Sequence, residues 1–243
     1  KHMDMTFTPA SGYPVWDPEV RVYDVTDNRT GEKSILYVDL FARPGSKEGG
    51  AWMSKIQNPS ADGKKPNIII MNMNLVKPAG KGPVLVSPGQ VETLFHEGGH
   101  ALNGLKGTQT KYFSRMGTGN GSDYVEIHSM MSENWAFHAD VMDTYARHYK
   151  TGKSLPKTLL ADKEKSGAFM ASWDMLRLIQ NARRDINFHA QNRNDFVSDA
   201  EVEKASQLPS KLSDHVRPYP LTRFSHMFSS PDSQYAAGYY AYS

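Results

Sequence analysis

One stretch near the middle of the chain constrains the fold more than any other, the sequence TLFHEGGHALNGL at residues 93–105. It places two histidines four residues apart, with a glutamate directly after the first. On an α-helix residues i and i+4 share one face, so His96 and His100 can offer ring nitrogens to a single zinc ion. Glu97, one position further round, is placed to act as general base toward water activated by that ion. The pattern predicts a zinc-binding helix of a hydrolase.

The start of this helix can be read from the sequence. Ser87 predicts the N-cap, Pro88 the first helical position and Gln90 the partner in a capping box. Apolar residues then recur at three-to-four spacing and form one stripe that buries the helix, at Val91, Leu94, Phe95, Leu102 and Leu105. Asn103-Gly104 predicts the C-terminal stop.

Zinc sites in hydrolases use three protein ligands and leave one position open, so a third ligand is required. The next helical stretch offers four candidates, and spacing alone does not choose among Glu126, Glu133, His128 and His138. Glu126 has the best local case because it stands among apolar residues, where a carboxylate is costly to bury unless it is bound to a cation. A capping-box role opposite Asp123 is the alternative for Glu126. His128 points to the other side of that helix and is not expected to share the ion.

Composition removes several classes of function. The chain has 243 residues and no cysteine, so disulfide scaffolds, thiolate metal sites and cysteine nucleophiles are excluded. The formal net charge of +2 gives no field that would imply a nucleic-acid partner. No apolar run reaches 18 residues, so no membrane partner is expected either.

The order of elements predicts an α+β fold, mainly α with a small antiparallel β-sheet. Residues 21–73 are strand-like, notably SILYVDLFARPG (34–45), GGAWM (49–53) and NIIIMNMNL (67–75). Helices are expected near residues 87–104, 123–149, 156–162, 167–189 and 198–208. One domain is predicted over residues 20–243, β-rich over 20–80 and helical over 87–243. Residues 1–19 are interpreted as a tag remnant (KHMDM) and an N-terminal extension.

Several long motifs together resemble one known family. VETLFHEGGHALNGL, SDYVEIHSMMSENWAFHADVMDTYARHYKTG, YVDLFARPGSKEGGAWM and the tail FSHMF…YAAGYYAY are similar to the thimet oligopeptidase family of zinc metallopeptidases. Within the family, the bacterial peptidyl-dipeptidases are most alike. The resemblance runs over nearly the whole chain from about Val20. Gly98 departs from it, since the family usually has phenylalanine at that position.

The resemblance implies a zincin-like catalytic domain and a role for each matched residue. His96, His100 and Glu126 match the ligands of one Zn²⁺ per chain, and Glu97 matches the catalytic base. In the tail, His226 and Tyr239 match substrate contacts, while Tyr235 and Tyr242 match hydroxyl donors to the oxyanion. Gly50 and Ala51 correspond to an edge strand that pairs with the peptide backbone of the substrate.

We therefore expect a zinc-dependent metallopeptidase that hydrolyses short oligopeptides and releases C-terminal dipeptides. Because family members are much longer, the chain resembles a truncated catalytic core, and a missing N-terminal domain or partner chain is expected. The alternative is a weak or inactive zinc-bound module that binds peptides and needs that missing part. A cytoplasmic location is expected, with the periplasm as the alternative.

Overall fold

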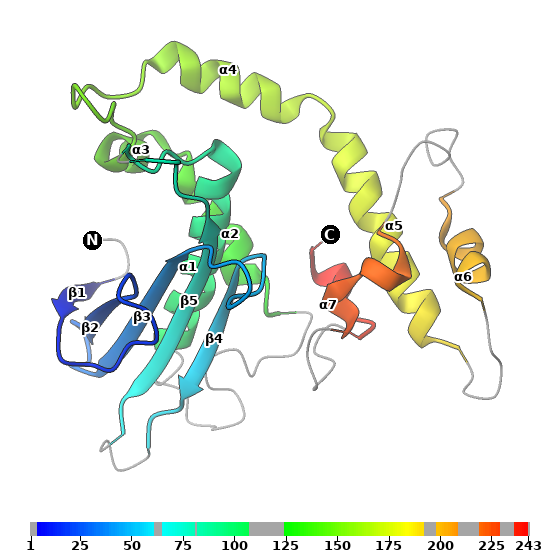
Figure 1. Ribbon diagram of the computed structural model, residues 1–243. Helices are drawn as coiled ribbons and strands as arrows, with labels where there is room; N and C mark the ends of the chain where they lie inside the picture. Colours follow the sequence, from blue (N-terminus) through cyan, green and yellow to red (C-terminus); the bar gives the residue numbers. More distant parts are fainter. Residues whose placement is uncertain are drawn as a thin grey trace. The chain divides into compact units, whose positions relative to one another are not determined.

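The computed structural model describes residues 4–60, 65–80, 82–106, 124–191, 198–208, 219–228 and 236–242. The chain divides into two compact units, Lys1–Asn120 with Ile127–Ser154 and Gly121–Glu126 with Leu155–Ser243. The first unit contains β1 (Met5–Ala10), β2 (Arg21–Asp27), β3 (Lys33–Phe41), β4 (Trp52–Gln57), β5 (Asn67–Leu75), α1 (Pro88–Lys106), α2 (Ile127–Ala136) and α3 (Ala139–Tyr145). The second contains α4 (Lys157–Ala168), α5 (Ala171–His189), α6 (Asp199–Ser206), α7 (Ser225–Phe228) and two short 3-10 turns, Leu221–Arg223 and Tyr239–Tyr242 (Figure 1).

The five strands form one sheet in the order β1-β2-β3-β5-β4. Three of its pairings are antiparallel as predicted, but β3 and β5 pair in parallel, so the prediction of a purely antiparallel sheet is wrong at its centre. After β3 the chain runs to the edge of the sheet, where it forms β4. It then turns back, and β5 is inserted between β3 and β4. There β5 packs side chains on both faces, with Ile69 and Met71 buried in one cluster and Ile68 and Ile70 partly buried against another.

β1 lies ahead of the stretch that was expected to be strand-like. Four of its six residues are exposed, so it lacks the alternation of apolar and polar residues that identifies a half-buried strand. It nevertheless pairs with β2 from Met5 to Ala10. The sheet therefore takes in residues before position 20, while the division into a tag remnant and a single domain stays a prediction.

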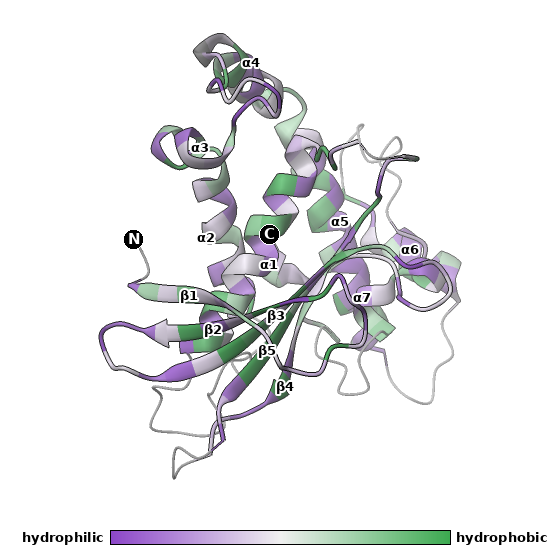
Figure 2. Cartoon of the chain, turned by 60° about the vertical axis from the view of Figure 1, so that its left-hand side comes forward, coloured by the Kyte–Doolittle hydropathy of each residue, from purple (hydrophilic) through white to green (hydrophobic). Residues whose placement is uncertain are grey.

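The main core lies between α1 and one face of the sheet. It consists of Val25, Leu36, Val38, Ile69, Met71, Ala101 and Leu105. Intervening residues of the same strands, such as Ile35 and Tyr37, belong to a second cluster on the other face. Both central strands are hydrophobic over much of their length in Figure 2, because each of them buries side chains on both faces.

The predicted start of α1 is confirmed. The helix begins at Pro88, and the backbone N–H of Gln90 donates to Ser87 Oγ at 3.2 Å. The backbone N–H of Ser87 in turn donates to Gln90 Oε1 at 2.8 Å. This reciprocal capping box satisfies two donors that the first helical turn leaves open.

The predicted C-terminal stop of α1 is wrong, since the helix continues to Lys106. Gly104 is buried inside it, and its carbonyl oxygen accepts a hydrogen bond from Asn67 Nδ2 at 2.8 Å. A Cβ at this position would lie 2.9 Å from Ile69 Cδ1. Glycine therefore permits α1 to approach β5 closely rather than ending the helix.

The helix expected over residues 123–149 is broken in two. α2 ends at Ala136 and α3 begins at Ala139, with His138 in extended backbone between them. The hydroxyl of Tyr145 donates to the carbonyl oxygen of Ala136, a group that the end of α2 leaves without an intrahelical donor. A side chain of α3 thus supports the break, which local propensity does not reveal.

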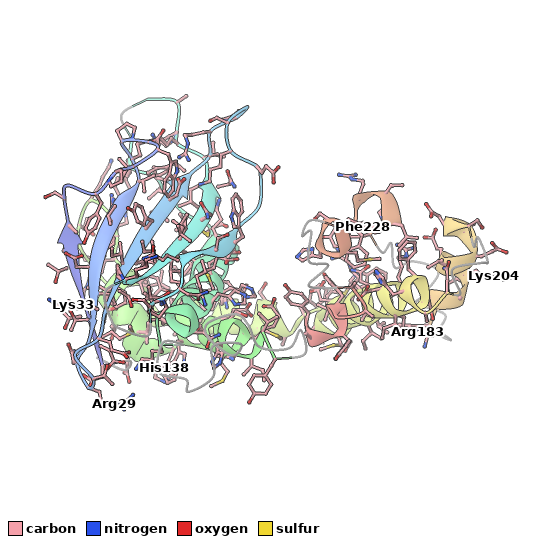
Figure 3. All side chains as sticks on the ribbon, turned by 90° about the horizontal axis from the view of Figure 1, so that it is seen from below. Arg29, Lys33, His138, Arg183, Lys204 and Phe228 are labelled. Carbon is pink, nitrogen blue, oxygen red and sulfur yellow. The ribbon has the colours of Figure 1, made fainter. Side chains whose placement is uncertain are left out.

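In the second unit, α5 and α6 pack around a cluster of Ala182, Val202, Leu221, Phe224, Met227 and Tyr239. α6 begins at a full capping box between Ser198 and Glu201. Arg183 of α5 donates to the carbonyl oxygens of Ala205 and Ser206, both at 3.3 Å, at the end of α6 (Figure 3). Helix-terminal carbonyls and the apolar cluster together join the two helices.

Candidate metal centre

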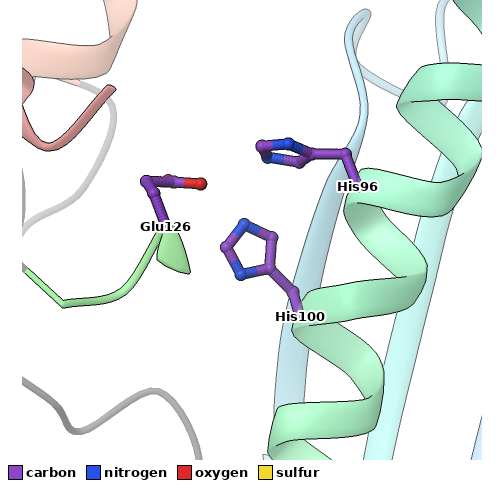
Figure 4. A group of neighbouring side chains, drawn as sticks. All are labelled: His96, His100 and Glu126. Carbon is purple, nitrogen blue, oxygen red and sulfur yellow. The ribbon is translucent and has the colours of Figure 1, made fainter. Parts of the chain in front are cut away.

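α1 brings the two histidines together as the four-residue spacing predicts. The ring centroids of His96 and His100 are 4.9 Å apart and the rings are inclined at 81°. His100 is buried and His96 is partly buried. Both rings project from the same side of α1 (Figure 4).

Glu126 completes a group that could hold a metal ion. It is joined directly to Ile127, the first residue of α2, and only 1% of it is exposed. One ligand atom from each of His96, His100 and Glu126 lies within 4.8 Å of the other two (Figure 4). Two imidazoles and a buried carboxylate are the donor set that zinc takes in hydrolytic sites, so these residues fit the predicted ion.

Glu133, one of the ligand candidates in the sequence, lies beside this group and contacts His96. Its Oε1 is 2.6 Å from Nδ1 of His96. Because Nδ1 faces Glu133, Nε2 is the His96 nitrogen that could bind an ion. Carboxylates that bind the far nitrogen of a ligand histidine orient the ring and select its tautomer. His128 and His138 are not part of the group among the described residues.

Glu97 lies inside the first unit, with 5% of it exposed. It directly follows His96 on α1, so the same turn of helix carries a candidate ligand and the candidate base. Buried ionisable groups beside candidate metal ligands are candidates for a functional role, so Glu97 remains the candidate base.

The two glycines between the histidines have different surroundings. A Cβ at Gly99 would lie 2.5 Å from the His128 carbonyl oxygen, 2.6 Å from Ser132 Oγ and 2.8 Å from Ser129 Cα. A Cβ at Gly98 would meet nothing within 4 Å. Gly99 therefore allows the close contact of α1 with α2, whereas no contact in the chain requires glycine at position 98.

This difference gives a matched pair of variants. Gly99→Ala is expected to lower the free energy of unfolding by about 1–3 kcal/mol, because the added methyl overpacks the contact with α2. Gly98→Ala is expected to raise it by up to about 1 kcal/mol through helix propensity. Denaturant unfolding of both variants measures the two changes. Equal effects at the two positions would contradict the inference that Gly99 is the contact glycine.

β4 is an edge strand of the sheet, with β5 on one side of it. Gly50 and Ala51 directly precede it, and Gly50 has a φ of +96°, which suits glycine. Asn74 Nδ2 donates to the carbonyl oxygens of Glu48 and Gly50, both at 2.7 Å. These bonds hold the entry to β4 against the end of β5.

A buried charge network fixes the start of the segment that connects β3 to β4. Asp39, 2% exposed, accepts hydrogen bonds from Arg43 Nη1 at 2.8 Å and Trp16 Nε1 at 2.9 Å, and Lys47 Nζ lies 3.0 Å from its Oδ1. Burial raises the pKa of the Asp39 carboxyl, but these donors outweigh burial and hold the pKa below its ordinary value. The carboxylate thus stays charged and fastens the segment that leads to β4.

Three of the four tail residues singled out in the sequence lie together in the second unit. The His226 ring is 5.4 Å from the Tyr239 ring and 5.9 Å from the Tyr242 ring, centroid to centroid. Tyr239 and Tyr242 are 5.0 Å apart, and burial raises the pKa of Tyr239 above its ordinary value. Tyr235 lies outside the described residues.

None of the helices in the described ranges combines the length and the apolar character needed to cross a membrane.

Known proteins match this chain over almost all of its length. The profile of Peptidase family M3 matches residues 3–243. Dipeptidyl carboxypeptidase of Escherichia coli (strain K12) is 36% identical over 232 residues, covering 94% of this chain and 33% of that protein. Oligopeptidase A of the same organism is 34% identical, covering 94% and 34% respectively. Organellar oligopeptidase A, chloroplastic/mitochondrial, of Arabidopsis thaliana is 32% identical, covering 96% and 30%.

The chain therefore spans about a third of the length of the curated relatives that it matches. The family match covers far more than half of the chain, and it includes the helix that carries His96 and His100 as well as the tail tyrosines. This chain belongs to Peptidase family M3.

Proposed function

We propose that the protein is a zinc-dependent peptidase with a zincin-like catalytic domain, which hydrolyses short oligopeptides and releases C-terminal dipeptides. One observation carries the proposal: ligand atoms of His96, His100 and Glu126 lie within 4.8 Å of one another on and beside α1, next to the buried Glu97. The name of the dipeptidyl carboxypeptidase relative supports dipeptide release, and the names of the oligopeptidase relatives support short peptides as substrates.

His96 through Nε2, His100 and Glu126 would hold the ion, with Glu133 fixing the His96 ring. When bound, zinc supplies Lewis-acid activation of water and of the scissile carbonyl. Glu97 accepts the proton of the attacking water and later delivers it to the leaving amine. Glu133 and Glu97 are both needed, because Glu133 orients the ligand His96 and Glu97 moves the proton.

Charge that develops on the substrate carbonyl oxygen requires hydrogen-bond donors in the transition state. We assign this role to the hydroxyls of Tyr235 and Tyr242, with His226 and Tyr239 as substrate contacts. The packing of His226 with Tyr239 and Tyr242 in one aromatic cluster supports a common role for these three residues.

The backbone at Gly50 and Ala51 is proposed to bind the peptide as an added strand. Edge strands present unpaired N–H and C=O groups, and a substrate bound this way is recognised independently of its sequence. The anchoring of this segment by Asn74 supports the proposal, since a rigid edge binds an extended peptide at a lower entropic cost.

Metal analysis combined with hydrolysis of an internally quenched peptide tests the function. We expect one zinc per chain, loss of hydrolysis on treatment with a chelator, and recovery on addition of zinc. Mass analysis of the products should show C-terminal dipeptides. Hydrolysis that persists in metal-free protein would exclude the proposed chemistry, and stoichiometric zinc without hydrolysis would favour the peptide-binding module.

A missing N-terminal domain or partner chain, and a cytoplasmic rather than periplasmic location, stay predictions. Peptides remain the expected partners, with neither nucleic acid nor membrane.

A further inference from the structure

A buried carboxylate in α5 binds the backbone of the tyrosine-bearing tail. Asp185 is fully buried, with an exposed fraction of 0%. Its Oδ1 accepts a hydrogen bond from the N–H of Ala237 at 2.9 Å, and its Oδ2 accepts one from the N–H of Tyr239 at 2.8 Å. One side chain thus holds two backbone groups of a segment that follows it by more than fifty residues.

The segment that Asp185 holds is locally strained. Ala237 has a φ of +56°, a conformation that residues with a Cβ rarely adopt. Such a conformation persists only where the surrounding structure imposes it. The hydrogen bond from Ala237 to Asp185 supplies that constraint at the strained residue itself.

The neighbours of Asp185 support a holding role. Nδ1 of His189, one turn further along α5, lies 2.8 Å from Asp185 Oδ1. Asn181, one turn earlier, accepts a hydrogen bond from the N–H of Tyr219 at 3.1 Å. α5 thus uses a row of polar side chains to bind the backbone of two later segments, where an ordinary helix would bury apolar residues.

The hydrogen bonds to Asp185 also fix the position of Tyr239 and Tyr242, because they bind the backbone that carries these side chains. Tyr239 is directly bound, and it begins the short 3-10 turn that ends at Tyr242. Tyr239 packs edge-on against Phe224 with centroids 4.7 Å apart, so the turn is fixed by one apolar face and one carboxylate. Removal of the carboxylate would take away the two hydrogen bonds that fix the backbone of the turn and leave the aromatic packing in place.

We propose that Asp185 is a positioning residue, which sets the place of Tyr239 and Tyr242 by accepting hydrogen bonds from the backbone of the turn. Its effect on catalysis rests on the proposed function, whereas its effect on the tail does not. Sequence reasoning does not find this residue, because an aspartate within a helical pattern ordinarily indicates a solvated face.

Hydrogen exchange followed by mass spectrometry tests the proposal in Asp185→Asn, with Asp174→Asn as the matched control. Asp174 lies on the same helix, and its side chain is 71% exposed. An asparagine can accept only one of the two N–H bonds, so we expect exchange of peptides covering residues 236–242 to become about tenfold faster. Exchange in β5 and the zinc content should not change, and the control should match the unmodified protein.

A second substitution separates a positioning role from a merely structural one. Glycine adopts positive φ without strain, so Ala237→Gly in the Asp185→Asn background should restore part of the protection of the tail. In the peptide assay, Asp185→Asn should lower kcat about tenfold, because the oxyanion donor Tyr242 acts in the transition state. KM should rise by a smaller factor, through the substrate contact Tyr239.

Unchanged exchange in the tail of folded Asp185→Asn, or faster exchange throughout α5 without rescue by Ala237→Gly, would overturn the proposal. If Asp185→Asn does not fold, Asp185→Ser retains one acceptor and is measured in the same way. Hydrogen exchange does not depend on peptide hydrolysis. If the unmodified protein is inactive but Asp185→Asn still loses protection in the tail, the result would count against the proposed function and not against the positioning role of Asp185.

Discussion

Glu97→Gln is expected to lower the rate of peptide hydrolysis by about 10²–10⁴-fold, the contribution of a positioned general base. Glutamine has nearly the same size and shape, but it cannot take a proton from water. Because glutamine keeps the size and shape of this buried side chain, we expect the substitution to leave α1 and its packing in place. The measurement is kcat/KM on an internally quenched peptide, together with zinc content.

The matched control is Glu92→Gln, which removes the same charge from an exposed position on α1, one turn before His96. We expect its activity to stay within about twofold of the unmodified protein, since exposed charges contribute little. Equal activity of the Glu97→Gln variant and the unmodified protein would refute the general-base assignment. A loss of zinc in Glu97→Gln would instead indicate that Glu97 belongs to the ligand set.

Glu126→Ala is expected to weaken zinc binding by at least about 100-fold, because even residues that only support a ligand cost 10–100-fold when removed. The carboxylate is 1% exposed, and one of its oxygens lies within 4.8 Å of a ring nitrogen of each histidine, so its removal takes away a donor that is already in place. Competition with a chromophoric chelator gives the affinity. Circular dichroism of the metal-free variant shows whether the fold is kept.

Glu92→Ala, at the same exposed position as the earlier control, is the matched control for this variant and should bind zinc as the unmodified protein does. Unchanged zinc affinity in Glu126→Ala would move the third ligand to Glu133 or His138. Glu133→Gln tests whether Glu133 supports His96 or is itself a ligand. If Glu133 only supports His96, this variant should weaken zinc binding less than loss of a direct ligand does.

Local signals predicted several of the elements that hold the candidate site. The capping box at Ser87 and Gln90 forms as expected, and β5 has the bounds predicted for it. Both depend on residues a few positions apart, whose interactions the sequence specifies directly. The pairing of His96 with His100 follows in the same way from helical geometry.

Features that depend on distant residues were not predictable. Gly104 looks like a helix stop, but contact with Ile69 across the core makes it a packing position. The parallel pairing of β3 with β5 arises from the path of the chain through β4. The sequence presents Glu133 only as a ligand candidate, and its place at His96 Nδ1 depends on how α2 packs on α1.

The sequence by itself determined the candidate ligand histidines, the candidate base and the family, because short spacings and long motifs specify them. Only the tertiary structure decided which carboxylate joins the histidines, why Gly99 but not Gly98 is needed, and that Asp185 holds the tail. The reason is physical: a helix fixes neighbours three or four residues apart, whereas contacts between elements depend on packing that no local pattern records.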